Sequence, residues 1–379
     1  MIGKAYMQII DTGMISRSAP GTDRANLTFP AVVCLVDGTL MATWHSGTTK
    51  DGGDETIEVS RSSDHGKTWS TPERPFSIPI LNGLRGTIKI CYMTEIAPGR
   101  LIATAMWVDR ESYPGKGLFN PDTEGCLPMV IILADSSDNG AIWSPWREVP
   151  MPDDIGPPSL TNPLMQLTDG TLAMSIESNK HYDDASNWYQ KVVLMHSKDE
   201  GRTWGEPVIA GFDPTGRIFN WDQRAVVAPD GRIGTFLWTY DTEAETYLNI
   251  HRRVSADGGR TWSEAEDLGI TDQAAHPAVL PDGRTILAWV DRFHTQSIRA
   301  RMAPAIDSAF DPDSEVVLYT HQAPTEDDTD QTGALGFSVW SFGLPYAETL
   351  PNGDVLVVYY AGTETAMDIH WARLALDGK

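Results

Sequence analysis

Apolar residues occur along this chain in short runs, and pairs of runs are joined by a turn that ends in glycine. Residues 29–36 form one apolar run, Asp37 and Gly38 follow, and residues 39–44 form a second run. Asp-Gly between two strand-like runs indicates a β-hairpin, because both central residues of a type I′ turn need positive φ. A similar dipeptide (Asp-Gly, Asn-Gly or Pro-Gly) recurs along the chain, ending at Gly99, Gly170, Gly231, Gly283 and Gly353.

The spacing of these six turns predicts the architecture. Their glycines are 61, 71, 61, 52 and 70 residues apart, and each interval suits a four-stranded sheet with its loops. A hairpin is not stable alone in water, so the units must pack on one another. Six sheets arranged radially make a propeller with short, protected edges. We therefore expect an all-β, six-bladed β-propeller; the alternative is a β-sandwich with coincidental turns.

A second motif recurs between the hairpins. Residues 62–69, 197–204 and 255–262 fit Ser-x-Asp-x-Gly-x-Thr-Trp, and residues 136–143 fit with Ile in place of Thr. Ser and Asp side chains bond nearby backbone in a tight turn, and Gly supplies the positive φ. We therefore predict that the carboxylates of the motif are structural and not catalytic: Asp64, Asp138, Asp199 and Asp257.

This motif resembles the Asp-box, or BNR repeat, of the sialidase superfamily. The resemblance covers nearly the whole chain, since the motif stands in register with the hairpins. It implies one six-bladed propeller domain over residues 1–379, although length alone would indicate two or three domains. The last unit lacks a fourth strand of its own after residues 368–376, so we expect residues 5–10 to supply that strand and close the ring.

The composition of the chain argues against several kinds of binding partner. The chain has 29 basic and 52 acidic residues and a net charge of −23, which argues against binding to nucleic acid or to an anionic membrane. It has no run of about 18 apolar residues to span a membrane. Its first residues lack the apolar segment of a secretory signal, so we expect a cytoplasmic protein. The pattern does not indicate an oligomeric state.

No cofactor or metal is expected. Cys34, Cys91 and Cys126 are widely spaced, which fits buried free thiols in a reducing compartment. Glycine motifs for dinucleotides or phosphates are absent, and no histidine spacing indicates zinc. The acidic run at residues 326–330 lacks the spacing of an EF-hand, so we expect a solvated loop there.

The superfamily resemblance implies that a sugar would lie on the face formed by the start of each blade's first strand and the loop after its second strand. Carboxylates supply the acid and base of glycoside chemistry, arginines bind acidic groups bidentately, and histidines titrate near neutral pH. The candidate catalytic residues in these segments are Asp51, Asp54, Glu177, Asp222 and Tyr346. The candidate substrate-binding residues are Arg24, His45, Trp221, Arg224, His276 and Arg292.

The sialidase pattern fits these segments only in part. Sialidases surround the substrate carboxylate with three arginines, and they use an Asp acid/base and a Tyr nucleophile assisted by a Glu. Residues 28–30 occupy the position of the first arginine and contain none, Asn162 stands at the position of the Glu, and Glu177 stands at that of the second arginine. Residues 51–54 fall at the position of the acid/base, and Tyr346 falls near that of the nucleophile.

The presence of carboxylates at positions where sialidases have arginines resembles the pattern of the exo-arabinanases, which have the same fold and use two glutamates. We therefore expect an exo-acting glycoside hydrolase for small oligosaccharides, in which Glu177 works with a carboxylic acid from Asp51, Asp54 or Asp222. Three alternatives stay open. They are a true sialidase with a rearranged arginine set, a sugar lyase whose His or Tyr base acts on a uronate, and a propeller that binds carbohydrate without catalysis.

Overall fold

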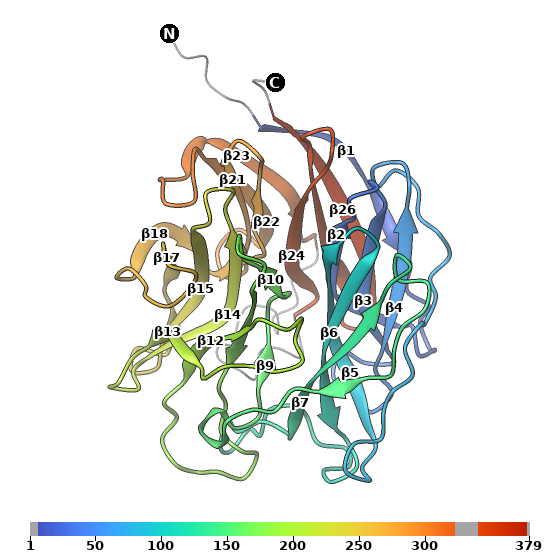
Figure 1. Ribbon diagram of the computed structural model, residues 1–379, viewed down its shortest axis with the longest axis vertical. Coiled ribbons are helices and arrows are strands. Elements are labelled where there is room, and N and C mark those ends of the chain that lie inside the picture. Colours follow the sequence, from blue (N-terminus) through green and yellow to red (C-terminus); the bar gives the residue numbers. More distant parts are fainter. Residues whose placement is uncertain (1–6, 323–339, 377–379) are drawn as a thin grey trace.

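Antiparallel sheets account for nearly all regular structure in this β-propeller. The computed structural model describes residues 7–322 and 340–376, which contain one short 3-10 helix, η1 (Asp153–Ile155). Neighbouring sheets lie side by side around the molecule (Figure 1). The acidic run at residues 326–330 lies outside the described residues.

Four sheets follow one another along the chain. The first contains β5 (Gly86–Ala97), β6 (Arg100–Asp109), β7 (Met129–Ser136) and β8 (Arg147–Glu148). The second contains β9 (Ser159–Leu160), β10 (Met165–Gln166), β11 (Leu172–Glu177), β12 (Lys191–Ser197) and β13 (Val208–Phe212). The third contains β14 (Ile218–Val227), β15 (Ile233–Asp241), β16 (Thr246–Tyr247), β17 (Asn249–Ser255) and β18 (Glu266–Thr271). The fourth contains β19 (Gln273–Ala274), β20 (Ala278–Val279), β21 (Thr285–Asp291), β22 (Ser297–Ala303) and β23 (Asp311–Thr320).

A seven-stranded sheet brings the two ends of the chain together. One antiparallel group contains β24 (Phe342–Thr349), β25 (Val355–Thr363), β26 (Ala366–Leu376) and β1 (Met7–Ser16), and another contains β2 (Asn26–Cys34), β3 (Leu40–Gly47) and β4 (Thr56–Ser62). A single parallel pair, Asn26 with Met367, joins the groups. In the segment expected to pair with the last unit, residues 5 and 6 lie outside the described part. Residues 7–10 belong to β1, which pairs with β26, and Ile10 stands at a shift in the register of that pairing (Figure 1).

All six predicted turns join paired strands, but the predicted type I′ geometry is wrong. In the first turn the Gly38 N–H donates to the Leu35 carbonyl (2.8 Å) and the Leu35 N–H donates to the Thr39 carbonyl (2.8 Å). Gly38 has φ +85°, whereas Asp37 keeps a negative φ. This is a three-residue loop that needs left-handed backbone at the glycine alone. The same pair of bonds recurs around Gly170, Gly231, Gly283 and Gly353.

The recurring Ser-x-Asp motif makes the local hydrogen bonds that its sequence predicts. Asp64 accepts from the Ser62 hydroxyl (2.8 Å) and from the Thr68 N–H (2.9 Å), and the Trp69 indole donates to the Gly66 carbonyl (2.9 Å). Equivalent bonds hold the motif carboxylates Asp138, Asp199 and Asp257. These carboxylates therefore close turns.

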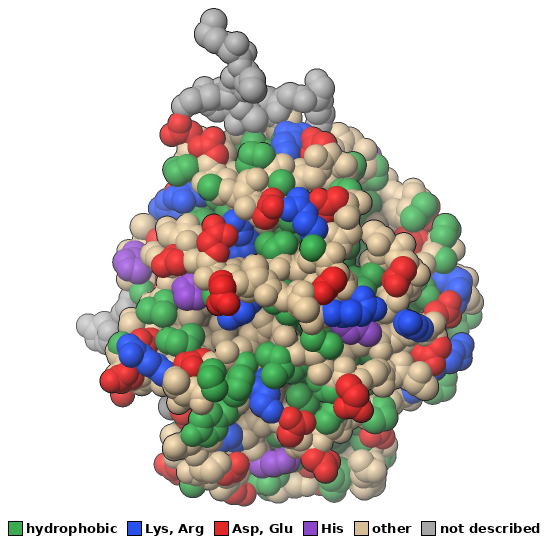
Figure 2. All heavy atoms as spheres, turned by 60° about the vertical axis from the view of Figure 1, so that its left-hand side comes forward, with side chains coloured by type: hydrophobic (Ala, Val, Ile, Leu, Met, Phe, Trp, Pro, Cys, Tyr) green, Lys and Arg blue, Asp and Glu red, His purple; other side chains and the backbone are tan. Residues whose placement is uncertain are grey.

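The core lies between neighbouring sheets. Its largest cluster joins buried apolar residues from several sheets, among them Val32 on β2, Ile102 on β6, Met174 on β11 and Val358 on β25. Acidic and basic side chains are interspersed over the face in Figure 2. In the described part of the chain, no helix has both the length and the apolar character needed to cross a bilayer, and the three cysteines form no disulfide.

Candidate functional site

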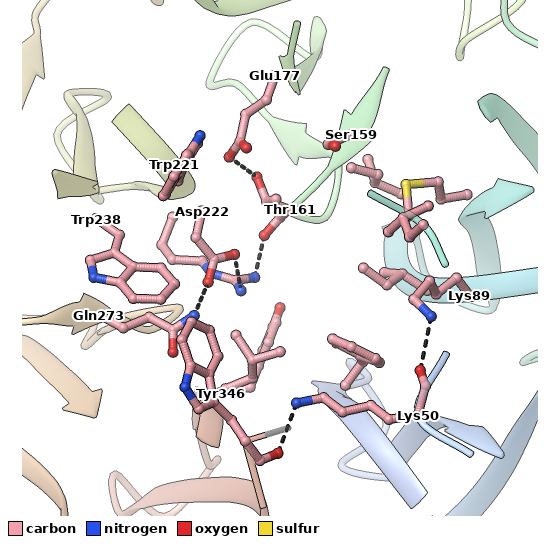
Figure 3. A pocket seen from close by; sticks show the side chains of 18 of the residues that line it. Lys50, Lys89, Ser159, Thr161, Glu177, Trp221, Asp222, Trp238, Gln273 and Tyr346 are labelled. Carbon is pink, nitrogen blue, oxygen red and sulfur yellow. Dashed lines mark hydrogen bonds and ion pairs between the residues drawn. The ribbon is translucent and has the colours of Figure 1, made fainter. Parts of the chain in front are cut away.

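Residues from all of the sheets line one open cavity of about 130 Å³. Figure 3 shows Glu177, Thr161, Asp222 and two tryptophans on one side of this cavity, and Lys50 and Lys89 on the other. Small-molecule sites are concave and mostly apolar, and a few convergent polar groups give them specificity. The cavity is therefore the candidate site.

Bulges in the first strands aim side chains into this cavity. Strands β2, β5, β14 and β24 each shift register where they pass it, and the shifted residues Phe29, Lys89, Asp222 and Leu344 all line it. Phe29, Asp222 and Leu344 have φ of +53°, +51° and +43°, which is a strained backbone for residues other than glycine. Bulges re-aim side chains and recur beside binding sites, so this repeated distortion marks the site independently of any one side chain.

Glu177 is the last residue of β11, at a strand end where most other hairpins carry an aromatic residue. Its side chain is buried and lines the cavity. Its Oε1 accepts from the Thr161 hydroxyl (3.0 Å) and from the Gln223 N–H (2.8 Å). Burial, reinforced by the nearby charge of Asp222, raises the pKa of Glu177 to about 8. Glu177 is therefore mostly protonated at neutral pH.

Asp222 is held by donors on both carboxylate oxygens. The Arg224 guanidinium donates to Oδ1 (2.5 Å), and the Gln273 amide donates to Oδ2. Burial raises the pKa of Asp222, while Arg224, Gln273 and Arg292 act in the opposite direction. Two carboxyl groups in one cavity with such different partners are a recognised basis for dividing acid and base roles.

Aromatic rings form the wall beside Asp222. Trp221 stacks on Tyr240 with ring centroids 5.1 Å apart, and Trp238 stacks on Tyr247 at 4.3 Å. Trp188, Trp221, Trp238 and Tyr247 all line the cavity. The stacked pairs keep these rings in fixed orientations, so they present a rigid apolar wall next to the carboxyl pair (Figure 3).

Two lysines opposite this wall were missed by the sequence analysis. The Lys50 ammonium donates to the Trp340 carbonyl (2.8 Å) and to the Tyr360 hydroxyl (2.9 Å). The Lys89 ammonium lies 2.5 Å from Glu55 and donates to the Lys50 carbonyl (2.9 Å). Both lysines fall in segments predicted to face the site, but a lysine inside an apolar run such as residues 88–91 gives no sign that a bulge will turn it inward.

Two predicted acids do not line the cavity. Asp51 forms ion pairs with Lys89 (3.1 Å) and Arg110 (2.6 Å) and accepts from the Leu118 N–H (2.7 Å). Burial opposes ionisation there, but the two cations hold the pKa of Asp51 well below its usual range. Asp54 is exposed and accepts from the Thr48 N–H (3.0 Å). Asp51 therefore joins two loops as a permanent anion, and Asp54 belongs to a surface turn.

Three predicted binding residues also lie outside the lining of the cavity. Arg24 forms an ion pair with Glu58 (2.7 Å) away from it. His45 is buried edge-on against Phe29 at 5.7 Å, and burial lowers the pKa of His45 to about 4. His276 lies behind the cavity, and burial lowers its pKa to about 3. These two imidazoles stay neutral at physiological pH and serve packing.

Tyr346 lines the cavity but is poorly placed to act as a nucleophile. Its ring stacks on His276 at 4.1 Å, and burial raises the pKa of Tyr346 well above its ordinary value. Of the three predicted arginines, Arg224 and Arg292 line the cavity and Arg24 does not. These residues therefore do not form the arginine triad and tyrosine of the sialidase pattern, whereas Glu177, Trp221 and Asp222 do lie together.

Comparison with known proteins supports a single superfamily. The family model of the BNR repeat-like domain matches residues 118–307. A sialidase from Micromonospora viridifaciens is 26% identical in an alignment over 250 residues that covers 62% of this chain and 36% of that sialidase. The chain therefore spans only about a third of the length of this relative.

Solved structures show the same fold at low identity. A protein of unknown function from Dyadobacter fermentans has a TM-score of 0.75 and 20% identity, with 98% of this chain and 99% of that chain covered. The intramolecular trans-sialidase of Ruminococcus gnavus has a TM-score of 0.63 and 14% identity, with 95% and 96% covered. The alpha-L-arabinanase of Penicillium chrysogenum has a TM-score of 0.63 and 16% identity, with 96% and 98% covered.

Proposed function

Because the chain belongs to the BNR repeat-like family, we propose that it is an exo-acting glycoside hydrolase for small oligosaccharides or glycosides. One observation carries the proposal: Glu177 and Asp222 line the same cavity, where burial raises the pKa of Glu177 to about 8 and cationic and amide donors hold Asp222. The neighbouring sialidase and arabinanase structures support the reaction class. We also propose six blades, obtained by counting the two antiparallel groups of the seven-stranded sheet separately, with β1 closing the ring.

Glu177 is assigned the general acid in this mechanism. Its proton passes to the glycosidic oxygen as the bond from that oxygen to the anomeric carbon breaks, so the leaving alcohol departs neutral. The sequence analysis expected the acid to come from Asp51, Asp54 or Asp222. The assignment is reversed because nothing of comparable strength opposes the rise in the pKa of Glu177 to about 8, whereas burial also raises the pKa of Asp222 but is opposed there by two arginines and an amide.

Asp222 is assigned the ionised partner. It either takes a proton from the water that attacks the anomeric carbon, or attacks that carbon itself. In the second case, water attacks the sugar ester in a second step, the Glu177 carboxylate takes the proton of that water, and the Asp222 carboxylate is released. The first course inverts the configuration of the sugar and the second retains it. In both courses Arg224 and Gln273 hold the carboxylate in place, and the Trp221 wall orients the sugar ring.

The test compares Glu177→Gln and Asp222→Asn with the wild type. A panel of 4-nitrophenyl glycosides, arabinobiose and 3′-sialyllactose identifies a substrate, and chromatography of products confirms hydrolysis. Each substitution is expected to lower kcat by several orders of magnitude while the protein remains folded, with Glu264→Gln as an exposed control. Near-wild-type turnover in both variants would refute the assignment of Glu177 and Asp222 as catalytic residues. Saturable binding without product would instead indicate a non-catalytic carbohydrate-binding propeller.

A further inference from the structure

A chain of hydrogen bonds through two buried side chains, Arg292 and Gln273, leads to Asp222. The Arg292 guanidinium donates to Oε1 of Gln273 (2.8 Å), and Nε2 of Gln273 donates to Oδ2 of Asp222. Gln273 and Arg292 are 3% and 1% exposed. Arg292 is itself fixed, because it also donates to the Phe342 carbonyl (2.8 Å) and packs over the Trp340 ring at 4.2 Å. The chain of hydrogen bonds therefore runs from the fixed guanidinium of Arg292 to the carboxylate of Asp222.

The chemistry of the two ends determines which way the amide points. A guanidinium can only donate hydrogen bonds, so Gln273 must turn its oxygen toward Arg292. The amide nitrogen then faces Asp222, and an ionised carboxylate can only accept. Without Arg292 the amide could rotate and place its oxygen against Asp222, which would repel the anion. Arg292 therefore acts on Asp222 through the orientation of Gln273.

We propose that Gln273, oriented by Arg292, is a positioning residue that keeps Asp222 ionised opposite Glu177. This inference rests on the proposed function, because it assigns a purpose to the difference between the two carboxyl groups. The other charged or titratable groups that face Asp222 are Arg224 on the same strand, Glu177 from β11 and Tyr92 from β5. Arg224 holds Oδ1, so Gln273 is the donor for Oδ2 among the described residues.

Loss of the amide donor should move the titration of Asp222. The pKa of Asp222 should rise, because its anion loses a hydrogen bond in a buried site. The negative charge of Asp222 contributes to the high pKa of Glu177, and because Asp222 is already ionised where Glu177 titrates, the Glu177 titration should stay nearly unchanged. The two titrations should therefore approach each other, which a merely structural glutamine would not cause.

The experiment titrates the whole protein without substrate. Carbon-13 NMR of selectively labelled Asp and Glu carboxyls follows Asp222 and Glu177 in the wild type, Gln273→Met and Gln273→Glu, with assignments taken from Asp222→Asn and Glu177→Gln. In Gln273→Met the Asp222 titration should move up by about one pH unit. Gln273→Glu keeps the size of the side chain and places a carboxyl against Asp222, so the shift should be larger. Gln190→Met is the matched control, since Gln190 is a buried amide that bonds Asn220 and does not line the cavity.

The outcomes separate this inference from the proposed function. An unchanged Asp222 titration in both folded Gln273 variants overturns the positioning role, whatever the activity. If Gln273→Met does not fold, Gln273→Glu decides alone. With a substrate in hand, the acid limb of the kcat/KM profile should shift upward with the titration. A shifted titration in a protein that hydrolyses nothing supports the positioning of Asp222 and rejects the hydrolase.

Discussion

Replacement of Glu177 by Gln should stabilise the protein, and the gain should depend on pH. The folded protein raises the pKa of Glu177 from 4.5 to about 8, chiefly by burial. Below pH 4.5 the carboxyl is protonated in both the folded and unfolded states, so it contributes no pH dependence there. Between pH 4.5 and 8 the folded state keeps a proton that the unfolded state has lost, so stability falls as pH rises. Above pH 8 Glu177 is ionised in both states, so the loss of stability has reached its full value and no longer changes with pH.

The magnitude follows from the shift. About 3.5 pKa units, at about 1.36 kcal/mol each, correspond to a cost of up to about 5 kcal/mol at high pH. Gln is close in shape to the protonated Glu, and its carbonyl can accept the bonds from the Thr161 hydroxyl and the Gln223 N–H. It has no charge to bury, so the variant should escape the cost. Glu348, whose pKa burial also raises to about 8, is present in both proteins and cancels in the difference.

Equilibrium urea unfolding, followed by tryptophan fluorescence from pH 4.5 to 9, measures the difference in the free energy of unfolding. The difference between Glu177→Gln and wild type should grow steadily up to about pH 8 and then become constant. The exposed Glu264→Gln should follow the wild-type curve throughout. A difference between Glu177→Gln and wild type that is the same at every pH would refute the claim that Glu177 is protonated in the folded protein, and with it the acid assignment.

Three further substitutions test the residues placed outside the chemistry. Lys89→Met should lower the free energy of unfolding by about 3–5 kcal/mol in urea titrations, because it removes a buried cation next to the buried Glu55; a loss below about 1 kcal/mol would contradict this. Arg24→Ala should cost only about 1 kcal/mol, because it removes a partly exposed partner of Glu58, and it should leave kcat/KM unchanged; a large loss of activity would restore Arg24 to the site. Asp64→Ala should lower the Tm by a few degrees in calorimetry with activity intact, since it removes bonds that close a turn; an inactive but folded variant would argue against this structural role.

The repeated hairpins could be predicted because each needs a feature visible in the chain. Two apolar runs flank a turn, and the turn ends in a glycine such as Gly38, whose φ of +85° suits no other residue as well. The turn type could not be predicted in the same way. Both a type I′ turn and the observed three-residue loop end at Gly38, and they differ in the backbone of Asp37, which tolerates either conformation.

Residues that line the cavity could be predicted where the sequence departs from the pattern of its repeat. Glu177 stands at a strand end where most other units carry an aromatic residue, and Asp222 opens a strand after Trp221. Lys89 was missed because alternation along residues 88–91 says nothing of the bulge that turns its side chain into the cavity. Arg24 was misplaced because four residues along the chain separate it from Thr28, whereas its partner Glu58 lies on β4, which no local pattern reveals.

The charge of the cavity can now be reconciled with that of the chain. A net charge of −23 would repel an anionic sugar at long range, yet four basic side chains line the cavity: Lys50, Lys89, Arg224 and Arg292. Arg224 binds Asp222 directly, Arg292 acts on Asp222 through Gln273, and Lys89 binds Glu55. Lys50 instead donates to the Trp340 carbonyl and the Tyr360 hydroxyl. The other three cations act on carboxylates of the protein, directly or through Gln273, and favour the ionised form of those carboxylates. Because burial makes the remaining carboxyl, Glu177, keep its proton, the same electrostatics that hold one anion in place leave an acid beside it.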